Sequence, residues 1–191
     1  KKKYEDAVML VLPSDHLIKY NEIYIDTLKA AIEVAEEDDN LITIGITPSY
    51  PETGYGYINF ERDEGDIKRN NIYRVKRFVE KPNLETAKEY LASGRYLWNS
   101  GMFVWKSSTI LSNFRELLPE TYEGLSKIYE TIGTAEEEEI LEREFSKFKS
   151  ESIDYGIMER AGNIYTIPGS FGWDDVGSWL ALERINKTND D

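Results

Sequence analysis

The sequence predicts an α/β fold with a mixed, mostly parallel sheet, and three stretches near its start support that prediction. Residues 7–12 form an unbroken apolar run, which is typical of a strand buried on both faces of a parallel sheet. Residues 21–37 place apolar side chains at helical spacing, and residues 41–47 form the next apolar strand. This order is that of a βαβ unit, whose crossover is right-handed and whose ligands bind beyond the carboxyl ends of the strands.

The remaining elements follow from alternating polarity and from residues that end helices. We expect strands at 54–58, 73–79, 97–105 and 164–167, helices at 84–93 and 176–184, an acidic helical stretch at 107–150, and an exposed polar excursion at 61–71. No repeat or linker divides the chain, so residues 1–191 are predicted to lie in one domain. Because the first strand is already of the buried type, we expect this domain to be partial, incomplete at its N-terminus.

The composition limits the available chemistry. The chain has no cysteine and one histidine, His16, which excludes disulfides, thiolate nucleophiles and metal sites built from cysteines or several histidines. A lone histidine is more typical of a packed, neutral imidazole with a hydrogen bond. No apolar run reaches about 18 residues and no signal peptide is evident, so we expect a cytoplasmic protein that makes no membrane contact.

The charge also narrows the choice of partners. The chain carries 36 acidic and 23 basic residues, for a formal net charge of −13. This charge repels a phosphate backbone, so we expect no nucleic-acid partner. A phosphorylated small substrate would need a cation beside it, and oxygen ligands combined with phosphates favour Mg²⁺ or Mn²⁺.

Two acidic turns carry candidate metal ligands. Asp15 follows the first predicted strand directly, where a sheet of this kind binds ligands. Asp174 and Asp175 lie in a second turn, which opens the last predicted helix. Each of these aspartates could instead cap a turn or a helix, and the residues alone leave that alternative open. The metal hypothesis therefore depends on both turns lying at one face of the sheet.

Three short segments carry groups that suit a sugar phosphate. At Gly56 the backbone can approach a ligand closely while Tyr55 and Tyr57 supply a wall, although a hairpin with stacked tyrosines explains the same residues. Glu80 can accept hydrogen bonds from two vicinal hydroxyls and Lys81 can act as a point charge for phosphate, unless the two form only an exposed ion pair. Asn99 offers both a donor and an acceptor to a hydroxyl, and the alternative there is a β-bulge.

Six segments occur along the chain in the order VLPSDH, PETGYGYI, FVEKP, WNSGMF, SIDYGIME and GWDDVGSW. Together they resemble the mannose-1-phosphate guanylyltransferases, which make GDP-mannose from GTP and mannose 1-phosphate. The resemblance extends over nearly the whole chain and implies a Rossmann-like, GT-A-like nucleotidyltransferase domain. It also implies that an oxygen of the sugar 1-phosphate attacks the α-phosphorus of GTP and that pyrophosphate leaves, without a protein nucleophile.

The resemblance implies a role for each matching residue. Asp15 and Asp175 would hold Mg²⁺ or Mn²⁺, and Lys81 would face the sugar phosphate, so these three are the predicted catalytic residues. Tyr155 would lie near the sugar pocket. The predicted substrate-binding residues are Gly56, Tyr57, Glu80, Lys81, Asn99 and Asp154.

The chain departs from the pattern of this family at one end. The family's glycine-rich loop, GGxGxRLxPLS in outline, and its following PK element bind the nucleotide phosphates, and neither motif occurs in these residues. We therefore expect that this chain alone does not catalyse the reaction. An unpaired sheet edge favours association, which makes a homodimer an expectation to test.

Other functions stay open at this stage. The same fold could activate another hexose 1-phosphate or use another nucleotide. A non-catalytic module that senses a sugar nucleotide is a second alternative, which the presence of both aspartates disfavours. A carbohydrate-binding module built on the tyrosines is a third.

Overall fold

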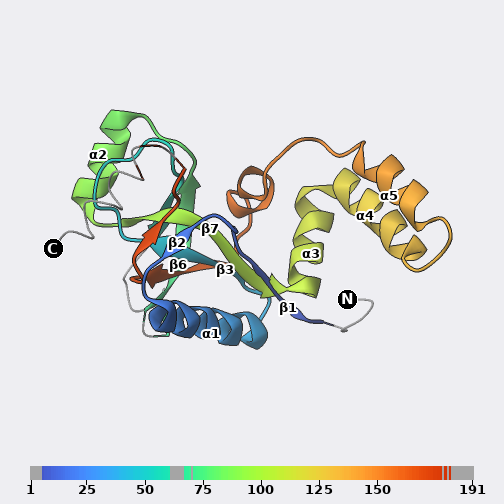
Figure 1. The fold of residues 1–191 in the computed structure, drawn as a ribbon, viewed down its shortest axis with the longest axis horizontal. Coiled ribbons are helices and arrows are strands. Elements are labelled where there is room, and N and C mark those ends of the chain that lie inside the picture. The colour runs from blue at the N-terminus through green and yellow to red at the C-terminus, as the bar shows by residue number, and fades with distance from the viewer. Residues whose placement is uncertain (1–5, 61–66, 70, 178, 180, 182–191) are drawn as a thin grey trace.

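The computed structural model describes residues 6–60, 67–69, 71–177, 179 and 181. Its strands are β1 (Val8–Val11), β2 (Leu17–Ile18), β3 (Leu41–Ile46), β4 (Tyr57–Phe60), β5 (Ile67–Arg69), β6 (Ile72–Val79), β7 (Tyr96–Lys106), β8 (Ile164–Gly169) and β9 (Trp173–Asp174). Its α-helices are α1 (Asn21–Glu37), α2 (Leu84–Ser93), α3 (Ser107–Leu117), α4 (Pro119–Thr131) and α5 (Glu137–Phe145), and a π-helix spans Asp154–Met158. Figure 1 shows α1 packed along the sheet, while α3, α4 and α5 extend to one side as a helical lobe.

The main sheet has the order β1-β7-β3-β8-β6-β4, with β5 beside β6 and a further pairing of β7 with β4. Within the described part of the chain, β3 and β8 pair in parallel, whereas the other pairings of this sheet are antiparallel. The prediction of an α/β fold with a mixed sheet is confirmed, and the prediction that the sheet is mostly parallel is wrong. The reason is β7, which runs between β1 and β3 in the opposite direction and so splits the expected βαβ unit.

The first strand differs most from its prediction. Strand β1 was expected to be buried on both faces, but Met9, Leu10 and Val11 are 42%, 38% and 41% exposed. The strand lies at the edge of the described sheet and pairs with β7 alone. An apolar run indicates that a strand can bury both of its faces, but it does not determine which strands and helices lie beside that strand.

The core lies on both faces of β3, whose six residues are all buried. On one face α1 packs a stripe of buried side chains, namely Leu28, Ala31, Val34 and Ala35. On the other face Ile110 of α3 joins Ile157 and Met158 of the π-helix. Burying an aliphatic side chain such as Val34 stabilises a fold by roughly 1.5–3 kcal/mol, so the spacing that predicts α1 also fixes its position on the sheet.

The shorter helical predictions have separate outcomes. Helix α2 has the predicted bounds, because Asn83 accepts a hydrogen bond from Thr86 N at its start and Gly94 ends it with φ 63°. The closing helix predicted at 176–184 lies mostly outside the described residues, and Val176 and Gly177 at its start are not helical. Most of the polar excursion at 61–71 also lies outside them, although residues 67–69 form β5.

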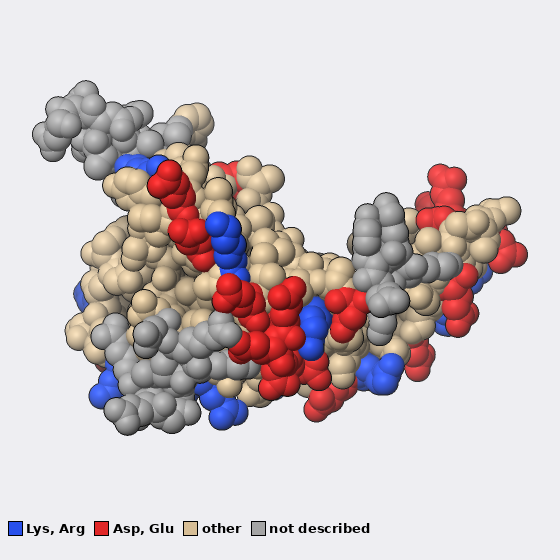
Figure 2. Space-filling view, turned by 90° about the horizontal axis from the view of Figure 1, so that it is seen from below, with Lys and Arg blue, Asp and Glu red and all other residues tan. Residues whose placement is uncertain are grey.

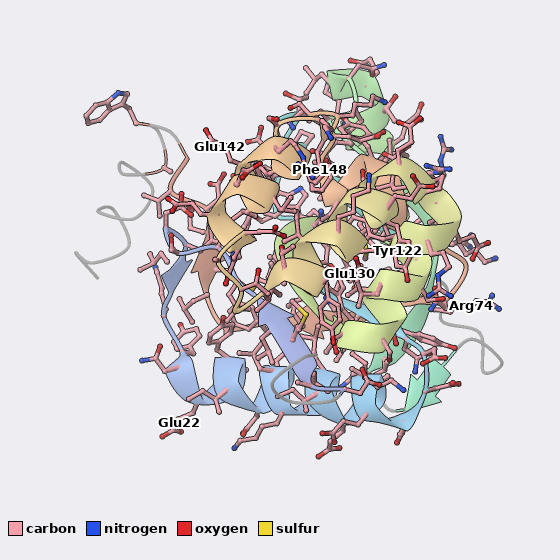
Figure 3. All side chains as sticks on the ribbon, turned by 90° about the vertical axis from the view of Figure 1, so that its right-hand side faces the viewer. Glu22, Arg74, Tyr122, Glu130, Glu142 and Phe148 are labelled. Carbon is pink, nitrogen blue, oxygen red and sulfur yellow. The ribbon has the colours of Figure 1, made fainter. Side chains whose placement is uncertain are left out.

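The helical lobe has a charged centre of its own. Glu144 on α5 is only 3% exposed. Its carboxylate accepts hydrogen bonds from Lys147 Nζ at 2.8 Å and from Arg143 Nε at 3.0 Å, and Lys127 Nζ of α4 lies 3.5 Å away. Nearby, the ring of Phe148, labelled in Figure 3, packs so closely on Gly124 of α4 that a Cβ there would collide with it. Charge pairing and close packing therefore join α5 to α4.

The outer face of α1 is acidic. The C-terminal part of this helix and the residues that follow it expose Glu33, Glu36, Glu37, Asp38 and Asp39. Figure 2, which views the molecule from the side of α1, shows acidic side chains gathered in the middle of this face. No helix among the described residues is both long and apolar enough to cross a bilayer.

Replacing Glu144 with Gln should destabilise the helical lobe. Hydrogen bonds from Lys147, and then from Arg143, lower the pKa of Glu144 to about 2, well below its usual value of 4.5. A lowered pKa in the folded state adds stability above pH 4.5 and loses it as the pH falls toward 2. Glu144→Gln should therefore melt below the wild type at pH 7, and the difference should shrink over that acid range, as followed by circular dichroism. The matched control is Glu142→Gln on the same helix, since Figure 3 shows Glu142 pointing away from the lobe; an equal loss there would contradict the prediction.

Candidate functional site

A two-residue ladder brings the two acidic turns together. Strand β2 pairs antiparallel with β9, with Leu17 opposite Asp174 and Ile18 opposite Trp173. The amides of Lys19 and Tyr20 both donate to the carbonyl of Phe171, at 3.1 and 3.0 Å, and extend this contact. Turns that lie far apart in the sequence therefore meet at one place, as the metal hypothesis requires.

His16 lies among the carboxylates of both turns. Its Nδ1 accepts a hydrogen bond from Trp173 Nε1 at 3.0 Å, and the two rings meet edge to face at 5.2 Å. Burial lowers the pKa of His16, while Asp15, Asp175 and Asp174 oppose that effect. Because Nδ1 accepts, the neutral imidazole carries its proton on Nε2. The expectation of a packed, hydrogen-bonded imidazole is confirmed.

The three aspartates have different environments. Asp174 Oδ1 accepts from the amide of Val176 at 2.9 Å, so this aspartate does cap a turn, and Val176 has φ 53°. Asp175 Oδ1 accepts from the Tyr55 hydroxyl at 2.5 Å and from the amide of Gly177 at 3.3 Å. Asp15 is exposed, and neither its carboxylate nor Asp175 Oδ2 has a hydrogen-bond partner within the described residues. Those oxygens are available to a ligand.

These oxygens suit a hard divalent cation that also binds substrate. Among the described residues, no three His, Cys, Asp or Glu side chains come close enough to form a complete metal site. A pair of carboxylates is, however, the usual protein contribution to a Mg²⁺ site, whose other ligands are phosphates and water. The donors at Asp15 and Asp175 therefore fit Mg²⁺ or Mn²⁺ held jointly with a phosphorylated substrate.

The residues predicted to bind the sugar meet where β4 begins and β6 ends, beside β7. Tyr57 at the start of β4 pairs with Val79 of β6 and with Trp98 of β7. Neighbours of these three positions, Gly56, Glu80 and Asn99, therefore lie side by side. The amide of Asn99 donates to the carbonyl of Gly56 at 2.8 Å, and a Cβ on Gly56 would collide with Glu80 Oε2. A side chain at position 56 would have to displace the Glu80 carboxylate, which occupies that space.

Lys81, which follows β6, has an unusual backbone conformation. It has φ 46°, which is uncommon for a residue with a side chain, and its amide donates to the carbonyl of Tyr55 at 3.3 Å. Its ammonium bonds Glu80 Oε1 at 3.0 Å, which raises the pKa of Lys81. The lysine side chain is 61% exposed and that of Glu80 only 14%, so the pair is not simply an exposed ion pair. A partly buried acceptor therefore lies beside an accessible cation.

Asn99 is held on every side. Its Nδ2 donates to Asp154 Oδ1 at 2.7 Å, while its Oδ1 accepts from Thr43 Oγ1 at 3.3 Å and from the amide of Gly101 at 3.2 Å. The β3–β7 register shifts between Thr43 and Gly45, so the predicted β-bulge alternative is present as well. Asp154 opens the π-helix, a rare conformation that is frequent at functional sites. These three hydrogen bonds fix the orientation of the Asn99 side-chain amide.

Tyr57 is a correction, because the structure places it in the core. Its side chain is fully buried, its hydroxyl donates to the carbonyl of Glu52 at 2.8 Å, and its ring packs on Tyr90 and Tyr96. A ring without exposed surface cannot form the wall of a sugar pocket. The tyrosine that reaches the site is Tyr55, which the sequence placed in the same wall but which is not among the predicted substrate-binding residues. Its signal was its position beside Gly56 in that motif.

The Tyr55 hydroxyl remains a hydrogen-bond donor at neutral pH. Burial, together with the hydrogen bond to Asp175, raises the pKa of Tyr55 above its usual value of 10. Its ring meets those of Trp98 and Trp173 edge to face, at 5.3 and 5.5 Å. This aromatic cluster links β7 to the turn that carries Asp175.

Comparison with known proteins identifies the family of the chain. The family model described as nucleotidyl transferase matches residues 1–191. The chain belongs to the nucleotidyl transferase family. Members of this family share the α/β architecture seen here, and a solved Thermus thermophilus protein, titled mannose-1-phosphate geranyltransferase, superposes with a TM-score of 0.83 at 38% identity, over 97% of this chain and 51% of that one.

The curated relatives confirm the resemblance read from the motifs. A mannose-1-phosphate guanylyltransferase of Salmonella montevideo is 40% identical over 95% of this nucleotidyl transferase and 39% of its own length. The xanthan biosynthesis protein XanB of Xanthomonas campestris is 40% identical over 95% of this chain and 38% of its own. The chain spans about two-fifths of the length of these relatives.

Replacing Gly56 with Ala should destabilise the nucleotidyl transferase chain. The new Cβ would strike Glu80 Oε2 and lie 3.3 Å from Asn99 Cβ. The Glu80 carboxylate would have to move, which disturbs its ion pair with Lys81, and Asn99 would have to shift slightly. We expect a loss of about 1–3 kcal/mol in the free energy of unfolding, measured by urea titration. Gly162→Ala is the control, because a Cβ there meets nothing within 4 Å and should change stability by less than about 0.5 kcal/mol. Equal effects of the two substitutions would show that crowding at Glu80 is unimportant.

Proposed function

We propose that this chain is the sugar 1-phosphate and metal-binding part of an enzyme that makes GDP-mannose and pyrophosphate from GTP and mannose 1-phosphate. The observation that supports this most directly is the meeting of the Asp15 and Asp175 turns through β2 and β9. Tyr55 connects that meeting point to the Gly56, Glu80 and Asn99 edge. The choice of mannose 1-phosphate and GTP as substrates is based on relatives that are named mannose-1-phosphate guanylyltransferases.

The proposed chemistry needs positioning and charge neutralisation. Asp15 and Asp175 would hold Mg²⁺ or Mn²⁺, which when bound neutralises charge on the phosphates that it touches. Lys81 would add an exposed ammonium beside the sugar phosphate. The Glu80 carboxylate and the Asn99 amide would hold sugar hydroxyls, because both are fixed before a ligand arrives. Such preorganised groups orient the attacking phosphate oxygen without a covalent step.

We propose further that residues 1–191 form part of one nucleotidyltransferase domain, and that the protein works in the cytoplasm, where GTP is available. Its proposed partners are these small-molecule substrates. The exposed apolar residues of β1 favour association with a second copy. The acidic face around the end of α1 disfavours contact with a nucleic-acid backbone.

Two alternatives make different demands on the same residues. An enzyme for another hexose 1-phosphate keeps the metal aspartates and changes only the preference for sugar hydroxyls. A module that senses a sugar nucleotide could bind its ligand without metal. Metal dependence and sugar preference of ligand binding therefore separate these functions.

Replacing either metal aspartate should remove the metal-dependent part of ligand binding. In the 191-residue chain, Mg²⁺ should tighten the binding of mannose 1-phosphate measured by isothermal titration calorimetry. Asp15→Asn and Asp175→Asn should each weaken binding in Mg²⁺ by roughly tenfold or more, since even outer-shell changes at metal sites cost about 10–100-fold. Their affinity without metal should change little.

Asp26→Asn is the matched control, because this exposed aspartate on α1 forms an ion pair with Lys29, at 3.1 Å, and belongs to neither acidic turn. It should leave binding unchanged. Metal-independent binding that survives both site substitutions would favour the sensing module instead. Equal affinity for glucose 1-phosphate would favour an enzyme for another sugar.

A further inference from the structure

Tyr55 is bonded to both halves of the candidate site. Its hydroxyl donates to Asp175 Oδ1 at 2.5 Å, and its carbonyl accepts from the amide of Lys81 at 3.3 Å. The first contact reaches a proposed metal ligand, and the second reaches the proposed contact of the sugar phosphate. One residue therefore connects two groups whose separation a bound substrate would have to match.

The hydroxyl of Tyr55 is fixed in position by its ring. The ring is half-buried and lies edge to face against Trp98 of β7 at 5.3 Å and against Trp173 of β9 at 5.5 Å. Trp173 itself is held through its Nε1, which donates to His16. Because the ring packs on the strand that precedes Asp175, the donor and its acceptor are positioned by the same cluster.

This contact makes the two oxygens of Asp175 unequal. Oδ1 accepts from the Tyr55 hydroxyl and from the amide of Gly177 at 3.3 Å. Oδ2 has no hydrogen-bond partner among the described residues, and a Cβ on Gly177 would lie 2.8 Å from it. The space beside Oδ2 is kept open by a glycine, while Oδ1 is fully engaged.

We propose that Tyr55 is a positioning residue that makes Asp175 a one-oxygen ligand of the metal. The proposal rests on the proposed function, in which Asp15 and Asp175 hold Mg²⁺ or Mn²⁺. Small octahedral cations take a single oxygen from a carboxylate, whereas Ca²⁺ accepts both oxygens and tolerates irregular geometry. With Oδ1 engaged by Tyr55, the site favours the smaller cation. Tyr55 thus sets metal selectivity without touching the metal.

Tyr55→Phe tests this role, because it removes the hydroxyl and keeps the ring. Binding of Mn²⁺ alone to the 191-residue chain can be followed by electron paramagnetic resonance, and binding of Ca²⁺ by its competition with Mn²⁺. We expect Tyr55→Phe to weaken Mn²⁺ about tenfold, within the range for outer-shell partners of metal ligands, and to weaken Ca²⁺ less. The ratio of the two affinities is the informative quantity, since general damage to the site would lower both alike.

The matched control is Tyr57→Phe, the same substitution two residues away. The Tyr57 hydroxyl bonds the carbonyl of Glu52 and does not contact Asp175, so both metal affinities should stay at the wild-type values. A second variant, Gly177→Ala, places a Cβ beside the other oxygen of the same carboxylate, Asp175 Oδ2, and should also weaken the binding of Mn²⁺. Circular dichroism melts without metal show whether each variant is folded.

Each outcome decides something definite. Unchanged Mn²⁺ affinity in Tyr55→Phe, or equal losses for Mn²⁺ and Ca²⁺, would overturn the positioning role while leaving the proposed function in place. Mn²⁺ binding that is absent from the wild type, or unaffected by Asp15→Asn and Asp175→Asn, would overturn the proposed metal site and the positioning role with it. The positioning role is supported if the ratio of Mn²⁺ affinity to Ca²⁺ affinity falls in Tyr55→Phe and stays at the wild-type value in Tyr57→Phe.

Discussion

The pairing of β2 with β9 is the contact on which the site depends. Each strand has two residues, and their ladder sets Leu17 against Asp174, so that the turns carrying Asp15 and Asp175 lie at the same end of it. Such a short ladder is weak by itself. It is supported by the Phe171 carbonyl, which accepts two further amides, and by the hydrogen bond between Trp173 and His16. Without these contacts the two acidic turns would be separate surface loops.

Negative charge dominates the candidate site. Besides Asp15 and Asp175 it holds Glu80, Asp154 and Glu159. Burial, and then the charges of Glu80 and Asp154, raises the pKa of Glu159. Lys81 offsets part of this negative charge and is already bonded to Glu80. A phosphate entering such a field is repelled unless a divalent ion accompanies it. The same carboxylates are good acceptors for hydroxyl groups, so one set of charges suits both the sugar and the cation of the proposed function.

The candidate site was predictable where chemistry follows from residue type. Glu80, Lys81 and Asn99 were singled out because a carboxylate, an ammonium and an amide suit a sugar phosphate, and the structure puts them at one edge. The tyrosines could not be assigned in this way. Tyr55 and Tyr57 are chemically identical and stand two residues apart, yet one bonds Asp175 and the other is fully buried. Alternation separates the faces of a strand, but Tyr55 precedes β4 and lies outside it.

Local patterns in the sequence determined the helices, the buried β3 and the ends of α2, because side-chain spacing and capping act within a few residues. The family also followed from short motifs in a fixed order. Only the tertiary structure decided that β7 runs between β1 and β3, that β1 lies exposed at an edge, and which oxygen of Asp175 remains open. Strand order and side-chain contacts join residues that are distant in the chain, and no local pattern records which of several compatible neighbours a strand or a carboxylate will meet.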